Sequence, residues 1–128
     1  MKYYIDNKAK KIYGNNIETD KHEIVLYITA VDGNQEATLG RGDTCVISTG
    51  FHLVADGMTP IFTHSSHVAL HLDRYWYTAK DNELMLQVAN PSTQKLTLTA
   101  GDEIASFVLV ENKVPFLHRV NTVKDLLE

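Results

Sequence analysis

The sequence predicts an all-β domain built of many short antiparallel strands. Runs of alternating apolar and polar residues, about 4–8 residues long, recur along the chain and indicate half-buried strands. Gly, Asp, Asn or Pro residues separate these runs, as they do in turns. The length of 128 residues and the 44% of hydrophobic residues suit one core, so we expect a single domain over residues 1–128.

Residues 82–110 give the clearest strand pattern. Leu84, Leu86 and Val88 share one face of an extended chain, and the alternation resumes after a polar, Pro-containing turn at residues 90–94. A Gly-Asp turn then precedes an apolar run whose β-branched content suits a buried strand. We therefore expect a meander of strands joined by turns. Its contribution to the core is expected to be Leu84, Leu86, Ile104, Phe107 and Leu109.

The remaining segments give shorter patterns. We expect an edge hairpin at residues 1–16, strands at 23–29, 45–54 and 59–62, and a loop at 31–43. Cys45 is followed by Val46 and Ile47, which predicts a small buried side chain in preference to a reactive thiol. At the end of the chain, Asn121 or Thr122 is expected to cap a short helix.

Charge and composition exclude several classes of function. The formal net charge of -4 gives no general attraction to nucleic acid or to an anionic membrane, because phosphate binding relies on clustered Lys and Arg. The single cysteine cannot form an internal disulfide, and no long apolar run is present. We therefore expect a soluble, cytoplasmic protein that binds neither nucleic acid nor membrane.

A histidine-rich segment and an aromatic segment are candidates for ligand binding. If residues 64–71 form a helical turn, His64, His67 and His71 fall on one face, which is one way to present imidazoles to zinc. No carboxylate or cysteine stands at a confirming spacing, so we favour histidines that face solvent or a subunit interface. Residues 74–77, Arg-Tyr-Trp-Tyr, suit either packing or stacking on a nucleotide base.

Four motifs, taken in order, resemble those of one known family. They are Ser-Thr-Gly-Phe-His-Leu at residues 48–53, Thr-His-Ser-Ser at 63–66, the Asn-Glu-Leu strand at 82–90 and Gly-Asp-Glu-Ile-Ala-Ser at 101–106. This succession resembles the trimeric dUTPase family and its dCTP deaminase relatives, over roughly residues 23–120. The resemblance implies a distorted jelly-roll β-barrel, a homotrimer, and ligand sites between subunits.

Several motif positions depart from that family. Val25 stands where the resemblance places a magnesium-supporting aspartate, and His64 stands where the phosphate loop of the family has an arginine. A neutral imidazole lacks the bidentate fork and the permanent charge of a guanidinium. Glu103 replaces an arginine and Ser106 a glutamine in the last motif, and no glycine-rich C-terminal arm is matched. The resemblance therefore implies that catalysis by this chain is weakened or lost.

The general base of the family can be placed in two ways. Counting back without gaps from residue 82 puts Tyr77 at the position of the aspartate and Lys80 at that of the tyrosine under the sugar, which leaves no base. An insertion at residues 78–81 would instead make Asp73 the base and Trp76 the sugar platform. We favour the ungapped alignment, because it preserves the spacing to the last motif.

These observations favour a catalytically inactive dUTPase-like protein that acts by binding. Its ligand is expected to be nucleotide-like and to contact His64, Ser65, Ser66 and one of Trp76 or Tyr77. No cofactor is expected, and Mg²⁺ would be required only by an active enzyme. A protein partner competes for the same surface, because Trp, Tyr and Arg dominate protein interfaces.

Two alternatives to an inactive binding protein stay open. One is an active deoxynucleoside triphosphate pyrophosphatase that uses Asp73 as its base, and the other is a purely structural assembly protein. The resemblance also suggests a phage or viral origin, and hence the host cytoplasm as the location of the protein.

Overall fold

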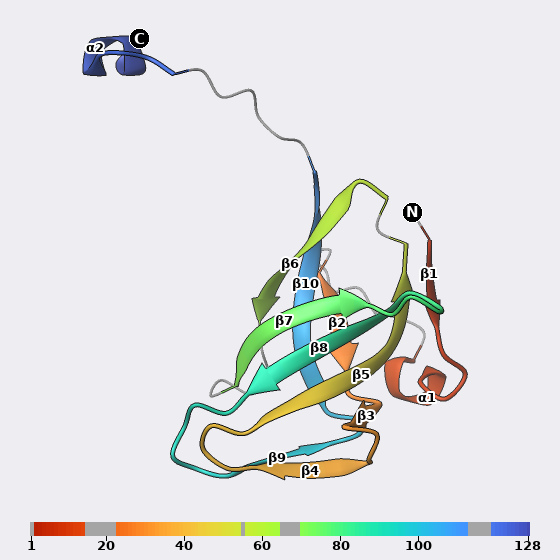
Figure 1. Cartoon of the computed structure of the whole chain (residues 1–128). Coiled ribbons are helices and arrows are strands. Elements are labelled where there is room, and N and C mark those ends of the chain that lie inside the picture. Colours follow the sequence, from red (N-terminus) through yellow and green to blue (C-terminus); the bar gives the residue numbers. More distant parts are fainter. Residues whose placement is uncertain (1, 15–22, 55, 65–69, 113–118) are drawn as a thin grey trace.

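The computed structural model describes residues 2–14, 23–54, 56–64, 70–112 and 119–128 (Figure 1). Over these residues the chain forms strands and two short helices, which confirms the all-β prediction. The elements are β1 (Tyr3–Ile5), α1 (Lys10–Tyr13), β2 (Ile24–Tyr27), β3 (Ala30–Val31), β4 (Glu36–Leu39), β5 (Thr44–Leu53), β6 (Met58–His64), β7 (His71–Tyr77), β8 (Glu83–Ala89), β9 (Leu96–Thr99), β10 (Glu103–Glu111) and α2 (Val123–Leu127).

In the described part of the chain, the strands are arranged in three open sheets. The largest sheet has the order β1-β5-β8-β7, with β3 also paired to β5, the second has the order β2-β10-β6, and the third joins β4 to β9. All of these pairs are antiparallel. Figure 1 shows the β5-β8-β7 layer in front of the β2-β10-β6 layer. The expected jelly-roll strands are therefore present without a closed barrel in the described part of the chain.

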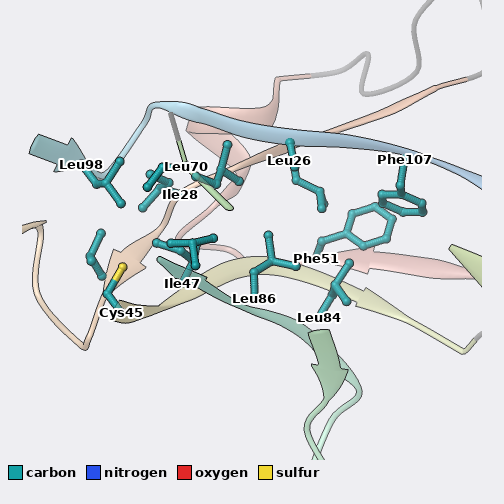
Figure 2. Packing of buried hydrophobic residues seen from close by; sticks show 14 of the residues in the cluster. Leu26, Ile28, Cys45, Ile47, Phe51, Leu70, Leu84, Leu86, Leu98 and Phe107 are labelled. Atoms are coloured by element: carbon teal, nitrogen blue, oxygen red, sulfur yellow. The ribbon is translucent and has the colours of Figure 1, made fainter. Parts of the chain in front are cut away.

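Apolar side chains from the two larger sheets meet between the layers (Figure 2). The Phe107 ring of β10 meets the Phe51 ring of β5 edge-on, with 5.9 Å between the ring centroids. Among the predicted core residues, Leu109 is only partly buried. The others are buried as expected: Leu84, Leu86, Ile104 and Phe107.

The predicted meander of residues 82–110 is wrong, because β8, β9 and β10 belong to three different sheets. The buried Asn90 explains why the chain turns away after β8. Its side-chain amide donates to the carbonyl oxygens of Leu39, at 2.9 Å, and Gln94, at 2.8 Å. These bonds hold the segment after β8 against β4, and β9 consequently pairs with β4.

The predicted edge hairpin at residues 1–16 is also wrong. After β1 the chain forms the one-turn helix α1, and its N-cap residue Ala9 and its last residue Tyr13 are buried against β5 of the largest sheet. Burial of these two residues stabilises a helix too short to form by its own propensity. The predicted loop at residues 31–43 likewise contains the short strands β3 and β4.

Three smaller predictions have mixed outcomes. His64 ends β6 and His71 begins β7, so neither of these two histidines is helical, and His67 lies outside the described residues. The terminal helix is confirmed, with the Thr122 hydroxyl accepting from the Asp125 amide at 3.1 Å. Cys45 is buried as expected, and burial raises the pKa of its thiol to about 11.

Neither helix in the described ranges is long and apolar enough to cross a membrane.

Candidate functional site

A bulge in β5 at residues 49–51 shapes the candidate site. The strand pairs with β8 up to Ser48, and its register has shifted when pairing resumes at His52. Gly50 has a φ of 65°, a left-handed conformation that glycine adopts without a steric cost. Its N–H donates to the Glu83 carboxylate at 2.9 Å, and its carbonyl accepts from the Asp6 amide at 3.0 Å. One residue therefore connects the N-terminal segment, β5 and β8.

The neighbouring Thr49 satisfies the buried polar groups of the bulge. Its hydroxyl donates to the Leu84 carbonyl at 2.6 Å and accepts from the Phe51 amide at 3.2 Å. The Tyr13 hydroxyl donates to the Thr49 carbonyl at 2.7 Å, and burial strongly raises the pKa of Tyr13. Because buried polar groups cost free energy when unpaired, this network fixes the backbone of the bulge and the position of α1.

His52 presents both ring nitrogens to hydrogen-bond acceptors. Nδ1 lies 2.8 Å from the Asp81 carbonyl oxygen, and Nε2 contacts the Asp6 carboxylate. A carbonyl and an ionised carboxylate can only accept, so both contacts are favourable only when the ring carries two protons. Burial lowers the pKa of His52, but the hydrogen bonds to Asp81 and Asp6 outweigh it and raise that pKa above its usual value.

Asp6, His52 and Glu83 form what we call the carboxylate–imidazole cluster. One ligand atom from each residue lies within 4.8 Å of the other two. Among the residues described, neither carboxylate forms an ion pair with a lysine or arginine. His52 is therefore the positive charge that the structure offers to this pair of carboxylates.

The cluster borders a cavity beneath the β7–β8 hairpin, which we call the hairpin pocket. The Leu53 amide donates to the Asn82 carbonyl at 3.1 Å, which holds the hairpin against the end of β5. Asn82 has a φ of 56°, a conformation that asparagine tolerates better than most residues. The pocket has a volume of about 430 Å³ and is lined by Lys2, Tyr3, Tyr4, Asp6, His52, Leu53, Val54, Asp81 and Asn82.

The structure places the predicted ligand residues of β7 on different faces. The Arg74 guanidinium lies 4.9 Å from the centroid of the Trp76 ring, whereas the Tyr77 ring packs edge-on against Tyr75. Successive residues of a strand point to opposite faces, so Trp76 and Tyr77 cannot stack on the same face of one ligand. The Tyr77 hydroxyl is buried and has no hydrogen-bond partner among the described residues.

Asp73, the alternative base, does not line the hairpin pocket. Asp73 is the extra residue of a bulge in β7, and its carboxylate lies 3.8 Å from His71 Nε2. It precedes the hairpin by five residues, or roughly 17 Å of strand. His64 is described only as the last residue of β6, while Ser65 and Ser66 lie outside the described residues.

Among solved structures, a close match in shape covers nearly the whole chain. It is an Asp-to-Asn mutant of the dUTPase from phage phi11 of S. aureus, with a TM-score of 0.63 and 13% sequence identity, over 96% of this chain and 97% of that chain. The fold is dUTPase-like. The phage enzyme coordinates a structural Mg(II) ion. No protein-family model and no curated protein matches the sequence.

Within the dUTPase-like fold, three departures from the family motifs fall on one row of the second sheet. Ser106 of β10 stands opposite Val25 of β2 on one side and opposite His64 of β6 on the other. By the sequence resemblance, these are the positions of a glutamine, an aspartate and an arginine. Ser106 is buried and Val25 is partly buried. Neither serine nor valine carries a carboxylate, so neither residue can supply one to a metal ion.

The carboxylate–imidazole cluster was not predicted from the sequence. His52 and Glu83 belong to two of the motifs that carry the dUTPase resemblance, and those motifs could have drawn attention to them. Asp6 belongs to no motif and lies 46 positions from His52. Only the pairing of β1 with β5, which extends the sheet beyond the bulge, brings Asp6 to the cluster.

We predict that Gly50→Ala destabilises the protein by about 2–5 kcal/mol in urea unfolding. A Cβ at this position would lie 2.7 Å from the Ala9 Cβ and would be held at a φ of +65°. The matched control is Gly57→Ala, because Gly57 has a φ of +66° and open space around it. The control should lose only about 1–2 kcal/mol, the cost of the left-handed backbone. Equal losses in the two variants would show that the contact with Ala9 is unimportant.

We predict that His52 stabilises the protein more at low pH than at high pH. Its folded pKa is raised, so its contribution is complete below the unfolded pKa of about 6.5 and is lost as pH rises through the folded pKa. The groups facing the ring are Asp6, Asp81, Glu83 and the Tyr4 ring. Unfolding of wild type and His52→Asn should be compared between about pH 5.5 and 9 in the presence of a chelator. A stability difference that stays constant over this range would contradict the charged imidazole.

Proposed function

We propose that this chain is a dUTPase-like protein that binds a nucleotide-type ligand without hydrolysing it. The observation that carries the proposal is the row of Val25, Ser106 and His64. In the resembled family, these positions supply a carboxylate, an amide and a guanidinium close to the phosphates. Valine offers no oxygen to a metal, serine is neutral, and histidine lacks the bidentate fork of arginine. The residues of this row do not fit the Mg²⁺ that an active dUTPase would require.

The general base of the reaction also lacks support. In the ungapped alignment Tyr77 takes the position of the aspartate, and burial raises its pKa above that of an ordinary tyrosine. A neutral phenol is a poor base near neutral pH. Asp73, the alternative base, lies in the β7 bulge beside His71 and is separated from the hairpin by most of the strand. Because neither Tyr77 nor Asp73 is placed to act as a general base, we infer that turnover is lost.

The hairpin pocket supports binding of a nucleotide-type ligand. Its volume of about 430 Å³ falls within the range of about 300–1,000 Å³ that is usual for small-molecule sites. Tyr4 is 52% exposed and offers aromatic surface to a base, whereas the Tyr3 ring stacks on Phe51, and Lys2 adds a positive charge. Stacking of a base on an aromatic side chain contributes about 1–3 kcal/mol.

The proposal keeps the assembly and contacts that the resemblance implies. It includes a homotrimer with the ligand between subunits, and contacts from His64, Ser65 and Ser66 to the phosphates. Trp76 and Tyr77 lie on the strand that leads into the hairpin. We take Trp76 as the aromatic contact with the ligand, because the Tyr77 ring packs against Tyr75.

We predict that the purified protein does not hydrolyse dUTP or dCTP in the presence of Mg²⁺. A general base contributes about 10²–10⁴-fold, and phosphate clamping adds further stabilisation, so their joint loss should leave no rate above background. Release of pyrophosphate should be measured beside an active dUTPase as a positive control. Turnover that disappears in Asp73→Asn would contradict the proposal and establish the gapped alignment.

We predict that calorimetric titration with linear and cyclic nucleotides detects binding of at least one of them. Tyr4→Ala and Trp76→Ala should each weaken this binding by about tenfold, because each removes aromatic surface from the ligand. Val123→Ala is a suitable control, since Val123 is an exposed apolar residue of α2. No heat from any nucleotide, with an unchanged melting temperature, would instead favour a protein partner on the same surface.

A further inference from the structure

We propose that Asp6, His52 and Glu83 form a binding site for a divalent transition metal ion such as zinc, in preference to Mg²⁺ or Ca²⁺. The site does not depend on the nucleotide proposal, because it uses neither the phosphate row nor a ligand. One donor atom from each of the three residues lies within 4.8 Å of the other two. Two carboxylates and one imidazole are a donor set that divalent transition metals accept.

His52 is oriented as a metal ligand. Its Nδ1 donates to the Asp81 carbonyl at 2.8 Å, which directs Nε2 toward the Asp6 carboxylate. Histidines that bind metals usually donate their second ring nitrogen to a carbonyl or a carboxylate in this way. The ring is buried, so its orientation is fixed by packing as well as by the hydrogen bond.

The two carboxylates differ in mobility. Glu83 is held through one oxygen by the Gly50 N–H at 2.9 Å, and its other oxygen has no hydrogen bond within the described part of the chain. The Asp6 side chain is 38% exposed, although its backbone is anchored to Gly50. Asp6 can therefore shift away from Nε2 to the separation of about 3–3.5 Å that two ligands of one zinc ion require.

The charge of the cluster favours a cation. With neutral His52 the cluster would hold two carboxylates and a nitrogen lone pair, and the described residues place no lysine or arginine against either carboxylate. A proton on Nε2 relieves this repulsion in the metal-free protein, and a metal ion replaces that proton. Asp6 and His52 also line the hairpin pocket, which gives an ion access and leaves room for water ligands.

The imidazole nitrogen of His52 favours a transition metal ion over Mg²⁺ or Ca²⁺. Mg²⁺ and Ca²⁺ prefer oxygen ligands, whereas zinc binds imidazole and carboxylate with similar ease. In the order of divalent ions, zinc also binds such sites more tightly than manganese does. We therefore expect zinc to bind well below the concentration at which Mg²⁺ has any effect.

The test uses the full-length protein after removal of metal with a chelator. Calorimetry with zinc should give one site per chain, and excess zinc should raise the melting temperature by about 5 °C or more. Co²⁺ should give a visible absorption band that reports nitrogen and oxygen ligation. Absence of stoichiometric zinc binding, or equal stabilisation by zinc and Mg²⁺, would overturn the proposal.

Conservative variants separate ligation from folding. Glu83→Gln keeps an oxygen for the Gly50 N–H and Asp6→Asn keeps an acceptor oxygen, so both variants should fold. Each should weaken zinc binding by about 100-fold or more, since even second-shell partners of a metal contribute about 10–100-fold. The control is His71→Asn, which removes an exposed histidine that also faces a carboxylate. Zinc affinity that is unchanged in Asp6→Asn and Glu83→Gln, or lost in His71→Asn, would place the metal elsewhere.

Discussion

The left-handed backbone of Gly50 is the constraint on which the site and the surrounding fold depend. At this residue β5 leaves its pairing with β8, and its carbonyl and amide bind the Asp6 backbone and the Glu83 side chain. A side chain here would also collide with Ala9. Because α1 must pass within contact of the Gly50 backbone, one residue sets the position of the N-terminal segment relative to the main sheet.

The polar groups around this bulge explain how a cluster of charges is accommodated beside an apolar core. The Tyr13 hydroxyl donates to the Thr49 carbonyl, and the Thr49 hydroxyl donates to the Leu84 carbonyl. The strand can therefore bend without leaving these buried polar groups unpaired. The bend then presents His52 to Asp6 on one side and to the hairpin on the other. The same geometry that stabilises the bulge therefore brings together an imidazole and two carboxylates.

Local patterns were sufficient to predict much of the sheet. Alternation identified β8, and strands were also predicted at the positions of β5 and the buried β10, whereas the bulge in β5 was not predicted. The strand order was not predictable, since the buried Asn90 redirects the chain through contacts distant in sequence. Helix α1 was missed for a similar reason, because Ala9 and Tyr13 are buried only by packing against β2 and β5.

For the candidate site as well, the sequence identified single positions, whereas the contacts between them depend on the fold. Motif resemblance identified the positions of Val25, His64 and Ser106 one at a time, but only the register of β2, β10 and β6 shows that they share a row. Asp6 carried no sequence signal, since a carboxylate after a short strand is common. Asp6 becomes part of a site only because the fold places it next to His52, which follows the bulge in β5.

Hydrogen exchange at the Gly50 amide tests most directly whether this bulge organises the site. In the wild-type protein the amide should exchange only through large-scale unfolding, because Gly50 is buried and its N–H is bound to Glu83. In Glu83→Ala the Gly50 and Asp6 amides should exchange faster together, while the Ile47 amide, in the regular part of β5, keeps its protection. Faster exchange at Gly50 alone, or at neither amide, would show that the bulge at Gly50 does not couple Asp6 to Glu83.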